Sequence, residues 1–399
     1  ALPPGRDTRD PRRCAPTWVR YSQECCSALD GGVVRSMGVV VVTGASGHLG
    51  ATLVRALRAR GQEVRALVHH DRRALDGLDV ETARGDLADE NSLRRAFSGA
   101  DLVYHTAAYI SILRDEQQRL YEVNVRGTRN VVEACLGSDV RRLVHVSSIE
   151  ALDSEPHDRP VDESRPLVQS GTFARGNVGR MAGPLASGGS SPYAHSKAAG
   201  ERQVRQGLAR GLDAVILYPT AIIGPHDYRQ GFPNAGLLAI CEGRLVALVD
   251  GGFNWVDVRD VAEGALRAGG QAPSGARYIL SGHWASLHDL AGMAREISGA
   301  PVPWLVFPLW AARIGAPFVA AASQLLGRRP LYTSEALRPL GGNRHISHER
   351  ATRELGYRPR PLRQTIVDTL QWCACRGVLA RQGPMPSAGG QVIDLLGGE

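Results

Sequence analysis

The sequence predicts an α/β fold, a doubly wound parallel sheet with helices on both faces and a smaller, mostly C-terminal lobe. Four consecutive valines at 39–42 predict a strand buried on both faces. A turn punctuated by glycines follows, and residues 51–60 then have the composition of a helix. Further strand-like runs at 63–68, 101–105, 142–148 and 277–280 suggest that this pattern continues.

Composition and charge limit the classes of function. The chain has 399 residues, which is enough for one large domain and a second lobe, and 43% hydrophobic and 22% charged residues are ordinary for a soluble protein. The net charge of +7 comes from arginines scattered along the chain, so we expect no nucleic-acid partner. The seven cysteines form no disulfide or metal-binding pattern, which predicts a reduced cytoplasmic location and no metal site.

The turn after the first strand has the arrangement of a dinucleotide site. Gly44 permits a tight turn, Gly47 lets backbone N–H groups approach a pyrophosphate, and Gly50 lets the helix pack close to the sheet. The N-terminus of the following helix presents the positive end of its dipole to the phosphates. We therefore expect a dinucleotide cofactor at this turn.

The second strand, 63–68, predicts which dinucleotide binds. An acidic residue after this strand accepts a hydrogen bond from the ribose 2′-hydroxyl of NAD, whereas basic residues accommodate the 2′-phosphate of NADP. The chain continues His69, His70, Asp71, Arg72 and Arg73, so basic residues outnumber the single acid. We expect NADP(H) to be preferred and NAD(H) to be possible, the alternative being that the arginines are merely solvated.

Tyr193 and Lys197 lie four residues apart in a segment, 192–208, with helical composition, and so share one helix face. Lys197 is the only lysine among 47 basic residues. Arginine serves wherever a fixed positive charge is enough, so a lone lysine indicates a need for a compact ammonium that can titrate. Ser147 and Ser148 end the strand 142–148, and open α/β sheets bind ligands at the carboxyl ends of their strands.

The turn at 43–50 resembles the cofactor loop of the extended short-chain dehydrogenase/reductase superfamily, which includes the NAD-dependent epimerases and dehydratases. Other family-like motifs follow in order between 38 and 372, at 85–87, 105–108, 124–128, 219–225, 255–262 and 355–359. The resemblance implies a Rossmann-type sheet, a nicotinamide cofactor, a small-molecule substrate and a homodimer.

The resemblance also implies the site residues. Tyr193 would be the general acid or base, Ser148 would hydrogen-bond the substrate oxygen, and Lys197 would lower the pKa of Tyr193 and hold the nicotinamide ribose. Tyr218 stands where the family usually has arginine. The expected cofactor contacts are Gly44, Ser46, Gly47, His48, Leu49, Gly50, His69, Arg72, Arg73, Asp86, Leu87, Thr106, Ala107, Ala108, Asn124, Ser147, Tyr193, Lys197, Tyr218, Pro219 and Ile222.

Three kinds of enzyme in this superfamily use these catalytic residues: reductases, nucleotide-sugar epimerases and nucleotide-sugar dehydratases. Family dehydratases carry an Asp–Glu pair after the catalytic hydroxyl residue, whereas this chain has Ser148, Ile149 and Glu150, which disfavours dehydration. Nucleotide-sugar enzymes usually carry an arginine that grips the diphosphate at the position of Phe253. The pattern therefore most resembles the dihydroflavonol 4-reductase and 3β-hydroxysteroid dehydrogenase branch, which transfers a hydride between nicotinamide and a hydrophobic ketone or secondary alcohol. The alternatives are a nucleotide-sugar epimerase with tightly bound NAD and a non-catalytic NADP-sensing regulator.

The expected organisation has four parts. Residues 1–37 form a disordered extension, and 376–399 a disordered tail. Residues 38–225, with a mobile loop at 167–190, bind the cofactor, and 255–282 return to that domain. Residues 226–254 and 283–375 form the substrate lobe. Within it, 301–326 is strongly apolar but interrupted by prolines, so we expect core first, then the wall of a substrate pocket, and a membrane-surface contact last.

Overall fold

The computed structural model describes residues 38–111, 116–169, 190–245, 247–299, 301–325 and 334–379. The extension expected at 1–37 lies outside the described residues, as do most of the loop expected at 167–190 and most of the tail expected at 376–399.

Seven parallel strands form the main sheet, in the order β10-β6-β5-β4-β1-β2-β3. They are β1 (Val39–Thr43), β2 (Val64–Val68), β3 (Glu81–Arg84), β4 (Ala100–His105), β5 (Arg142–Val146), β6 (Ala214–Pro219) and β10 (Arg277–Leu280). The strand order reverses between β1 and β4, and this switch point is where such sheets bind ligands. The predicted doubly wound sheet is confirmed.

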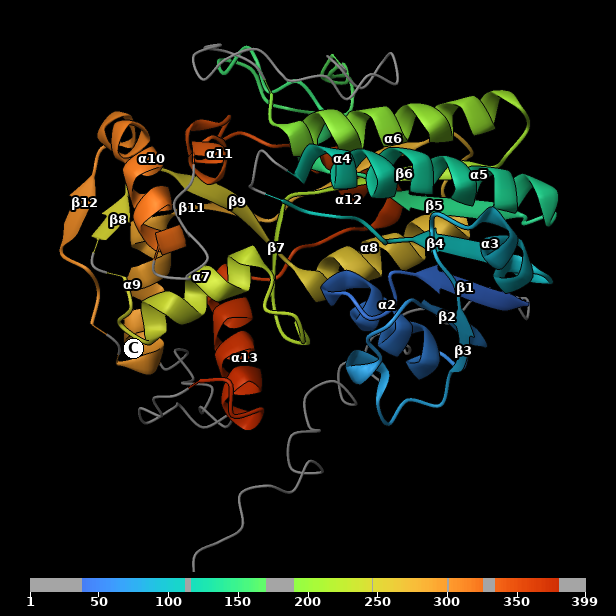
Figure 1. Cartoon of the computed structure of the whole chain (residues 1–399), viewed down its shortest axis with the longest axis horizontal. Coiled ribbons are helices and arrows are strands. Elements are labelled where there is room, and N and C mark those ends of the chain that lie inside the picture. The colour runs from blue at the N-terminus through green and yellow to red at the C-terminus, as the bar shows by residue number, and fades with distance from the viewer. Residues whose placement is uncertain are drawn as a thin grey trace, which may run out of the picture.

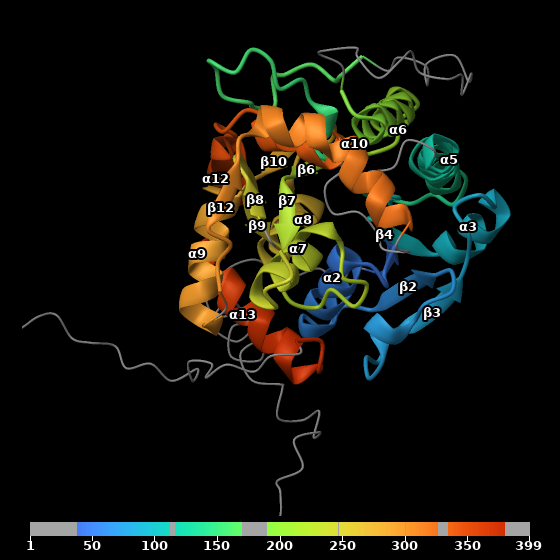
Figure 2. The same ribbon diagram turned by 60° about the vertical axis from the view of Figure 1, so that its left-hand side comes forward.

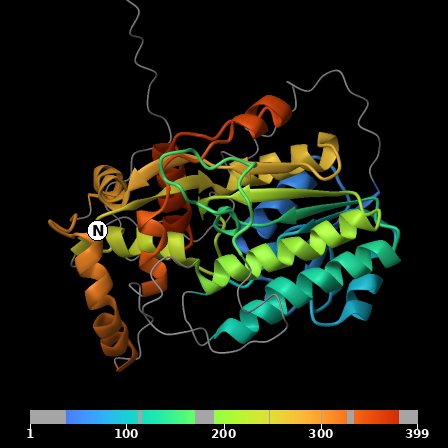
Figure 3. The ribbon, with the colours of Figure 1, turned by 90° about the horizontal axis from the view of Figure 1, so that it is seen from above.

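Helices cover both faces of the sheet because alternate side chains of each buried strand point to opposite sides. Val40 and Val42 pack with α2, α8 and α12, whereas Val41 packs with α3, α5 and α6. Figure 3 shows α5 and α6 side by side over one face. The helices of this part are α2 (His48–Ala59), α3 (Glu90–Phe97), α4 (Gln117–Tyr121), α5 (Thr128–Gly137), α6 (Pro192–Ala209), α8 (Val258–Gln271) and α12 (Glu349–Leu355).

The second lobe lies beyond the end of β6 (Figure 1). It holds a three-stranded sheet, β11-β9-β7, and a two-stranded sheet, β12-β8. Its strands are β7 (Ala221–Ile223), β8 (Ala247–Val249), β9 (Gly252–Asp257), β11 (His283–Ser286) and β12 (Leu305–Phe307). Its helices are α7 (Phe232–Cys241), α9 (Leu287–Ser298), α10 (Leu309–Leu325), α11 (Ser334–Leu337) and α13 (Leu362–Cys375).

The apolar segment 301–326 does not lie mainly in the core. Trp304, Phe307, Trp310 and Phe318 are exposed, so the expectation that ranked core first is wrong for these aromatics. Amphipathic periodicity locates an apolar face but does not say what covers it, which explains the error. Within the described ranges, no helix is both long enough and apolar enough to cross a membrane.

Candidate active site

The turn between β1 and α2 is shaped for a close ligand. Gly44 has a φ of +66°, and a Cβ atom there would lie 2.7 Å from the backbone of Ala107. A Cβ atom on Gly50 would lie 2.2 Å from the carbonyl oxygen of Gly44. Gly47 caps α2 without any side-chain hydrogen bond, so the first N–H groups of the helix are not capped by a side chain. These features fit a bound pyrophosphate.

Hydrogen bonds lock the ends of β1 and β4 together beside this turn. Thr106 donates its hydroxyl to the Thr43 carbonyl over 2.7 Å, and the His105 ring lies 2.8 Å from the Thr43 hydroxyl and 3.1 Å from that of Thr128. Burial, with the nearby charge of Lys197, lowers the pKa of His105 to about 3, so this ring stays neutral. Ala107 and Ala108 follow directly, and their small side chains leave room at the strand end.

The far end of the cofactor region, after β2 and β3, is rich in charged groups. The carboxylate of Asp71 accepts two hydrogen bonds from the Arg73 guanidinium, at 2.9 and 3.0 Å, and lies 3.9 Å from Arg229. The hydrogen bonds with Arg73 lower the pKa of Asp71 to about 2. His69 lies 3.3 Å from Asp86, which follows β3. Asp71 is therefore already occupied by arginine in this structure.

The proposed catalytic residues meet at the carboxyl end of β5. Ser148 caps the short helical turn Ile149–Ala151 and hydrogen-bonds Tyr193. Tyr193 lies in the first turn of α6, whose cap is Ser191, and Lys197 lies one turn further on. The Lys197 ammonium donates to the carbonyl of Val146 over 2.8 Å. A strand end and a helix start, 45 residues apart in sequence for Ser148 and Tyr193, are thus brought together.

The titration of this group differs from expectation. Burial, with the negative charge of Glu150, raises the pKa of Tyr193, and only its hydrogen bond with Ser148 opposes this. The predicted lowering by Lys197 is therefore not seen, because desolvation dominates and the ammonium is engaged by Val146. Burial lowers the pKa of Lys197 itself to about 8 against the opposing charge of Glu201.

Glu201 is a site-associated residue that the sequence analysis does not identify. Its side chain is fully buried, and it accepts hydrogen bonds from Ser147 at 3.0 Å, Tyr218 at 2.7 Å and Arg205 at 2.7 Å. The sequence feature that could have identified Glu201 is its position four residues after Lys197, which places both side chains on the same face of α6. Through its hydrogen bond with Glu201, Ser147 holds the end of β5 against α6, in addition to its expected role as a cofactor contact.

Tyr218, expected as a cofactor contact, has a fully buried side chain in the core beneath α6. Its hydroxyl is engaged by Glu201, so this side chain is not brought into the cofactor site. Pro219 is also buried, and Ile222 is half-buried near the edge of the sheet.

Asn124 links two segments of the chain by hydrogen bonds. It lies in the π-helical segment η5 (Glu122–Gly127) and exchanges two 2.8 Å hydrogen bonds with the backbone of Tyr109. Its amide also donates to Ser196 on α6 over 2.9 Å. Asn124 therefore ties the loop after β4 to α6, and its side chain is almost fully buried.

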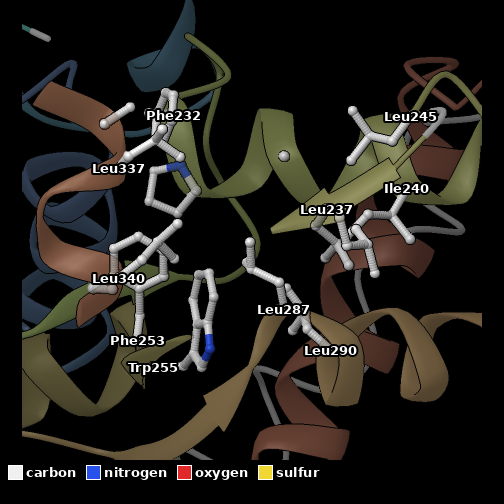
Figure 4. Close-up of a pocket in the computed structure, with 15 residues that line it drawn as sticks. Phe232, Leu237, Ile240, Leu245, Phe253, Trp255, Leu287, Leu290, Leu337 and Leu340 are labelled. Carbon is white, nitrogen blue, oxygen red and sulfur yellow. The ribbon is translucent and has the colours of Figure 1, made fainter. Parts of the chain in front are cut away.

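An apolar cavity lies in the second lobe, between α7, α9, α11 and the strand β9. Figure 4 shows Phe253 and Trp255 facing leucines of α7 and α9 across it. Ala336 and Leu337 of α11 also line the cavity, while the preceding residue, Glu335, interacts electrostatically with Glu150. Its lining is Ala221, Phe232, Pro233, Gly236, Leu237, Ile240, Leu245, Leu248, Phe253, Trp255, Leu287, Leu290, Ala336, Leu337 and Leu340.

Glu150 acts electrostatically on both Tyr193 and Glu335, and Glu335 directly precedes the cavity-lining Ala336. Glu150 also accepts a hydrogen bond from Ser191 over 3.1 Å. Burial and the charge of Glu335 raise the pKa of Glu150. Among the described residues, no cluster of three or more His, Cys, Asp or Glu side chains could hold a metal ion.

Comparison with known proteins places these features in a family. Residues 40–280 match the model of the NAD dependent epimerase/dehydratase family. Sterol demethylase protein B of Methylococcus capsulatus is 35% identical over 347 residues, covering 85% of this chain and 99% of that protein. A candidate dihydroflavonol 4-reductase of Synechocystis is 30% identical over 347 residues, covering 86% and 96%. The crystal structure of gox2253 superposes with a TM-score of 0.72 at 30% identity, covering 86% and 99%.

Proposed function

Because the chain belongs to the NAD-dependent epimerase/dehydratase family of enzymes, we propose that it is an NADP(H)-preferring oxidoreductase for a hydrophobic ketone or secondary alcohol. The observation that carries this proposal is the meeting of Ser148, Tyr193 and Lys197 at the carboxyl end of β5. The homodimer, the cytoplasmic location and the domain boundaries stay predictions.

The residues at the switch point fit a nicotinamide dinucleotide. A Cβ atom at Gly44 or Gly50 would collide with the backbone of Ala107 or Gly44, so only glycines permit this close packing of the turn, and the first N–H groups of α2 lie at its end, where we place the pyrophosphate. Lys197, at the end of β5, is the side chain to hold the nicotinamide ribose. When bound, the cofactor supplies or accepts the hydride.

Tyr193 is suited to act as the general acid of ketone reduction. Its raised pKa keeps the phenol protonated at neutral pH, and Ser148 is placed to hydrogen-bond the same substrate oxygen. With a bound cofactor supplying the hydride, Tyr193 would give its phenolic proton to the oxygen of the substrate carbonyl. Lys197, one helix turn from Tyr193 and with a pKa that burial lowers to about 8, holds its ammonium at the carboxyl end of β5.

The charges after β2 support NADP(H). An acid that selects NAD must offer its carboxylate to the ribose 2′-hydroxyl, whereas Asp71 already holds Arg73 and lies near Arg229. Arg72 and Arg73 are exposed at the end of β2, and we assign the 2′-phosphate to them. A guanidinium already in place at this position favours the phosphate-bearing cofactor.

The second lobe supports an apolar substrate. Phe253 and Trp255 line the cavity, and their ring centroids lie 5.1 Å apart in an edge-to-face contact. Phe253 stands at the position where nucleotide-sugar enzymes usually carry an arginine. The two relatives described above are named for sterol and dihydroflavonol chemistry, and both kinds of molecule are largely ring systems with few charges. We therefore assign the non-reacting part of the substrate to this cavity.

Nucleotide content tests the proposal against its main alternative. The protein is purified without added nucleotide and denatured, and the released nucleotide is identified. An empty protein that binds NADPH more tightly than NADH and reduces hydrophobic ketones agrees with the proposal. Near-stoichiometric NAD(H), with no net turnover of ketones, identifies an epimerase that recycles its cofactor in place.

A further inference from the structure

Helix α10 carries an exposed apolar face. Trp310, Ile314 and Phe318, here called the apolar stripe, are 68%, 65% and 75% exposed, and their spacing of four places them on one side of the helix. Trp304, just before β12, is 89% exposed. Figures 2 and 3 show α10 on the outside of the second lobe. Single exposed apolar residues are ordinary, but a continuous row of large ones marks an interaction surface.

The stripe is not the wall of the substrate cavity. The opposite face of α10 packs through Leu309 and Ala316 against Leu337 and Leu340. Those two leucines themselves line the apolar cavity. The helix therefore lies outside the cavity wall and turns its stripe away from it.

Charge and residue type indicate what covers the stripe. Within the described residues 301–325, Arg313 is the only charged residue, and the whole chain carries +7. Arg313, which precedes Ile314 in the sequence, is exposed. A second copy would bring the same positive segment to the contact, whereas anionic lipid headgroups complement it. Tryptophans such as Trp304 and Trp310 suit the boundary between headgroups and acyl chains, because the ring is apolar and its N–H is polar.

We propose that the apolar stripe docks the protein on an anionic lipid surface, with α10 lying in the plane of the interface. The 17-residue helix is interrupted by Pro317, so it lies on a bilayer and does not span one. One consequence rests on the proposed function: a lipophilic substrate dissolved in the bilayer would meet the enzyme next to its apolar cavity. The docking itself does not depend on that function.

Vesicle co-sedimentation of the full chain tests the proposal. The probes are vesicles of phosphatidylcholine alone and of phosphatidylcholine with phosphatidylglycerol. The wild type should bind the anionic vesicles, and Trp310→Ser/Ile314→Ser/Phe318→Ser should weaken that binding by about tenfold or more, since three large apolar side chains no longer insert. Circular dichroism and the midpoint of thermal unfolding verify that the triple variant is folded.

A matched pair of arginine variants tests the electrostatic part. Arg313→Gln should weaken binding to anionic vesicles, whereas Arg363→Gln, on α13 and remote from α10 in Figures 1 and 2, makes the same change of net charge and should leave binding unchanged. Equal loss in both variants would show a net-charge effect and overturn the assignment to α10.

Three further outcomes would overturn the proposal. The first is failure of the wild type to bind either kind of vesicle. The second is binding by the triple variant that equals that of the wild type. The third is a wild-type oligomer in light scattering that the triple variant converts to a monomer, without vesicle binding, which would identify the occupant as a second copy. NADPH affinity should be unchanged in the triple variant, so failure of docking and failure of the proposed function are distinguishable.

Discussion

Tyr218 donates its hydroxyl to the buried carboxylate of Glu201 over 2.7 Å, linking β6 to the catalytic helix α6. The same carboxylate accepts a hydrogen bond from the Ser147 hydroxyl at the end of β5. Glu201 follows Lys197 by four residues on α6. One acid therefore fixes α6 against two strands and contributes a negative charge near the site's ammonium. Its role is to position α6, because its carboxylate is engaged by Ser147, Tyr218 and Arg205.

Glu201→Gln should destabilise the fold and change the titration of the site. Losing the charged acceptor for Tyr218, Ser147 and Arg205 should cost about 1–3 kcal/mol in the free energy of unfolding. Removing the negative charge should also lower the pKa of Lys197, shifting the pH profile of turnover to lower pH. Tyr218→Phe, the matched control, should cost about 1 kcal/mol and leave the profile in place. Identical pH profiles for Glu201→Gln and the wild type would contradict the electrostatic role.

Lys197 should make stability depend on pH in the alkaline range. Its pKa is about 8 when folded and 10.5 when solvated, so the unfolded chain binds more protons between these values and stability rises as the pH increases through them. Relative to Lys197→Met, the wild type should gain about 2–3 kcal/mol of unfolding free energy between pH 8 and pH 10.5. Urea unfolding across this range measures the difference. A flat difference would show that the ammonium is not desolvated.

The glycine turn should not tolerate a methyl group. Gly50→Ala places a Cβ atom 2.2 Å from the Gly44 carbonyl, so backbone must shift where the pyrophosphate binds. NADPH affinity should fall by about tenfold or more. Gly270→Ala on α8, where nothing lies within 4 Å, should leave affinity unchanged and stabilise the helix by about 0.5–1 kcal/mol. Fluorescence titration measures both, and wild-type affinity in Gly50→Ala would exclude this turn from the cofactor site.

Much of the site could be predicted from sequence because its signals are local. The valine strand, the glycine turn and the spacing of Tyr193 and Lys197 each fall within about one supersecondary unit, where periodicity and turn chemistry are informative. The link between Glu201 and Tyr218 joins elements that only folding brings together, and tyrosine at 218 looked like a ligand contact. The pKa of Tyr193 also depends on burial, which sequence does not report.

Helix α10 shows a different limit. The spacing of Trp310, Ile314 and Phe318 is the same whether the row faces a core or a bilayer. Only the structure shows that the opposite face, through Ala316, is the buried one.

Cofactor preference should depend on the arginines after β2. Arg72→Ser/Arg73→Ser should weaken NADPH binding by about tenfold and change NADH binding little, because the 2′-phosphate loses its charged partners. Arg353→Ser, exposed on α12, removes an arginine elsewhere and should alter neither affinity. An equal loss of affinity for NADPH and NADH in the double variant would mean that these arginines do not bind the 2′-phosphate.

A charged side chain introduced into the cavity should weaken binding of a hydrophobic substrate. Phe253→Arg places a guanidinium among apolar side chains, so the KM for a hydrophobic ketone should rise by about tenfold or more while NADPH affinity stays near the wild-type value. Phe253→Leu keeps the apolar lining and should change KM much less. An unchanged KM in Phe253→Arg would place the substrate elsewhere.

The central claim is that Tyr193 transfers the proton at this site, and the direct measurement is single-turnover oxidation of bound NADPH by a hydrophobic ketone in Tyr193→Phe. The account predicts a rate lower by about a hundredfold or more, since the general acid is gone, with NADPH affinity within about twofold of the wild type. A wild-type rate in a folded variant that still binds NADPH would contradict it, because the hydride would then move without the proton of Tyr193.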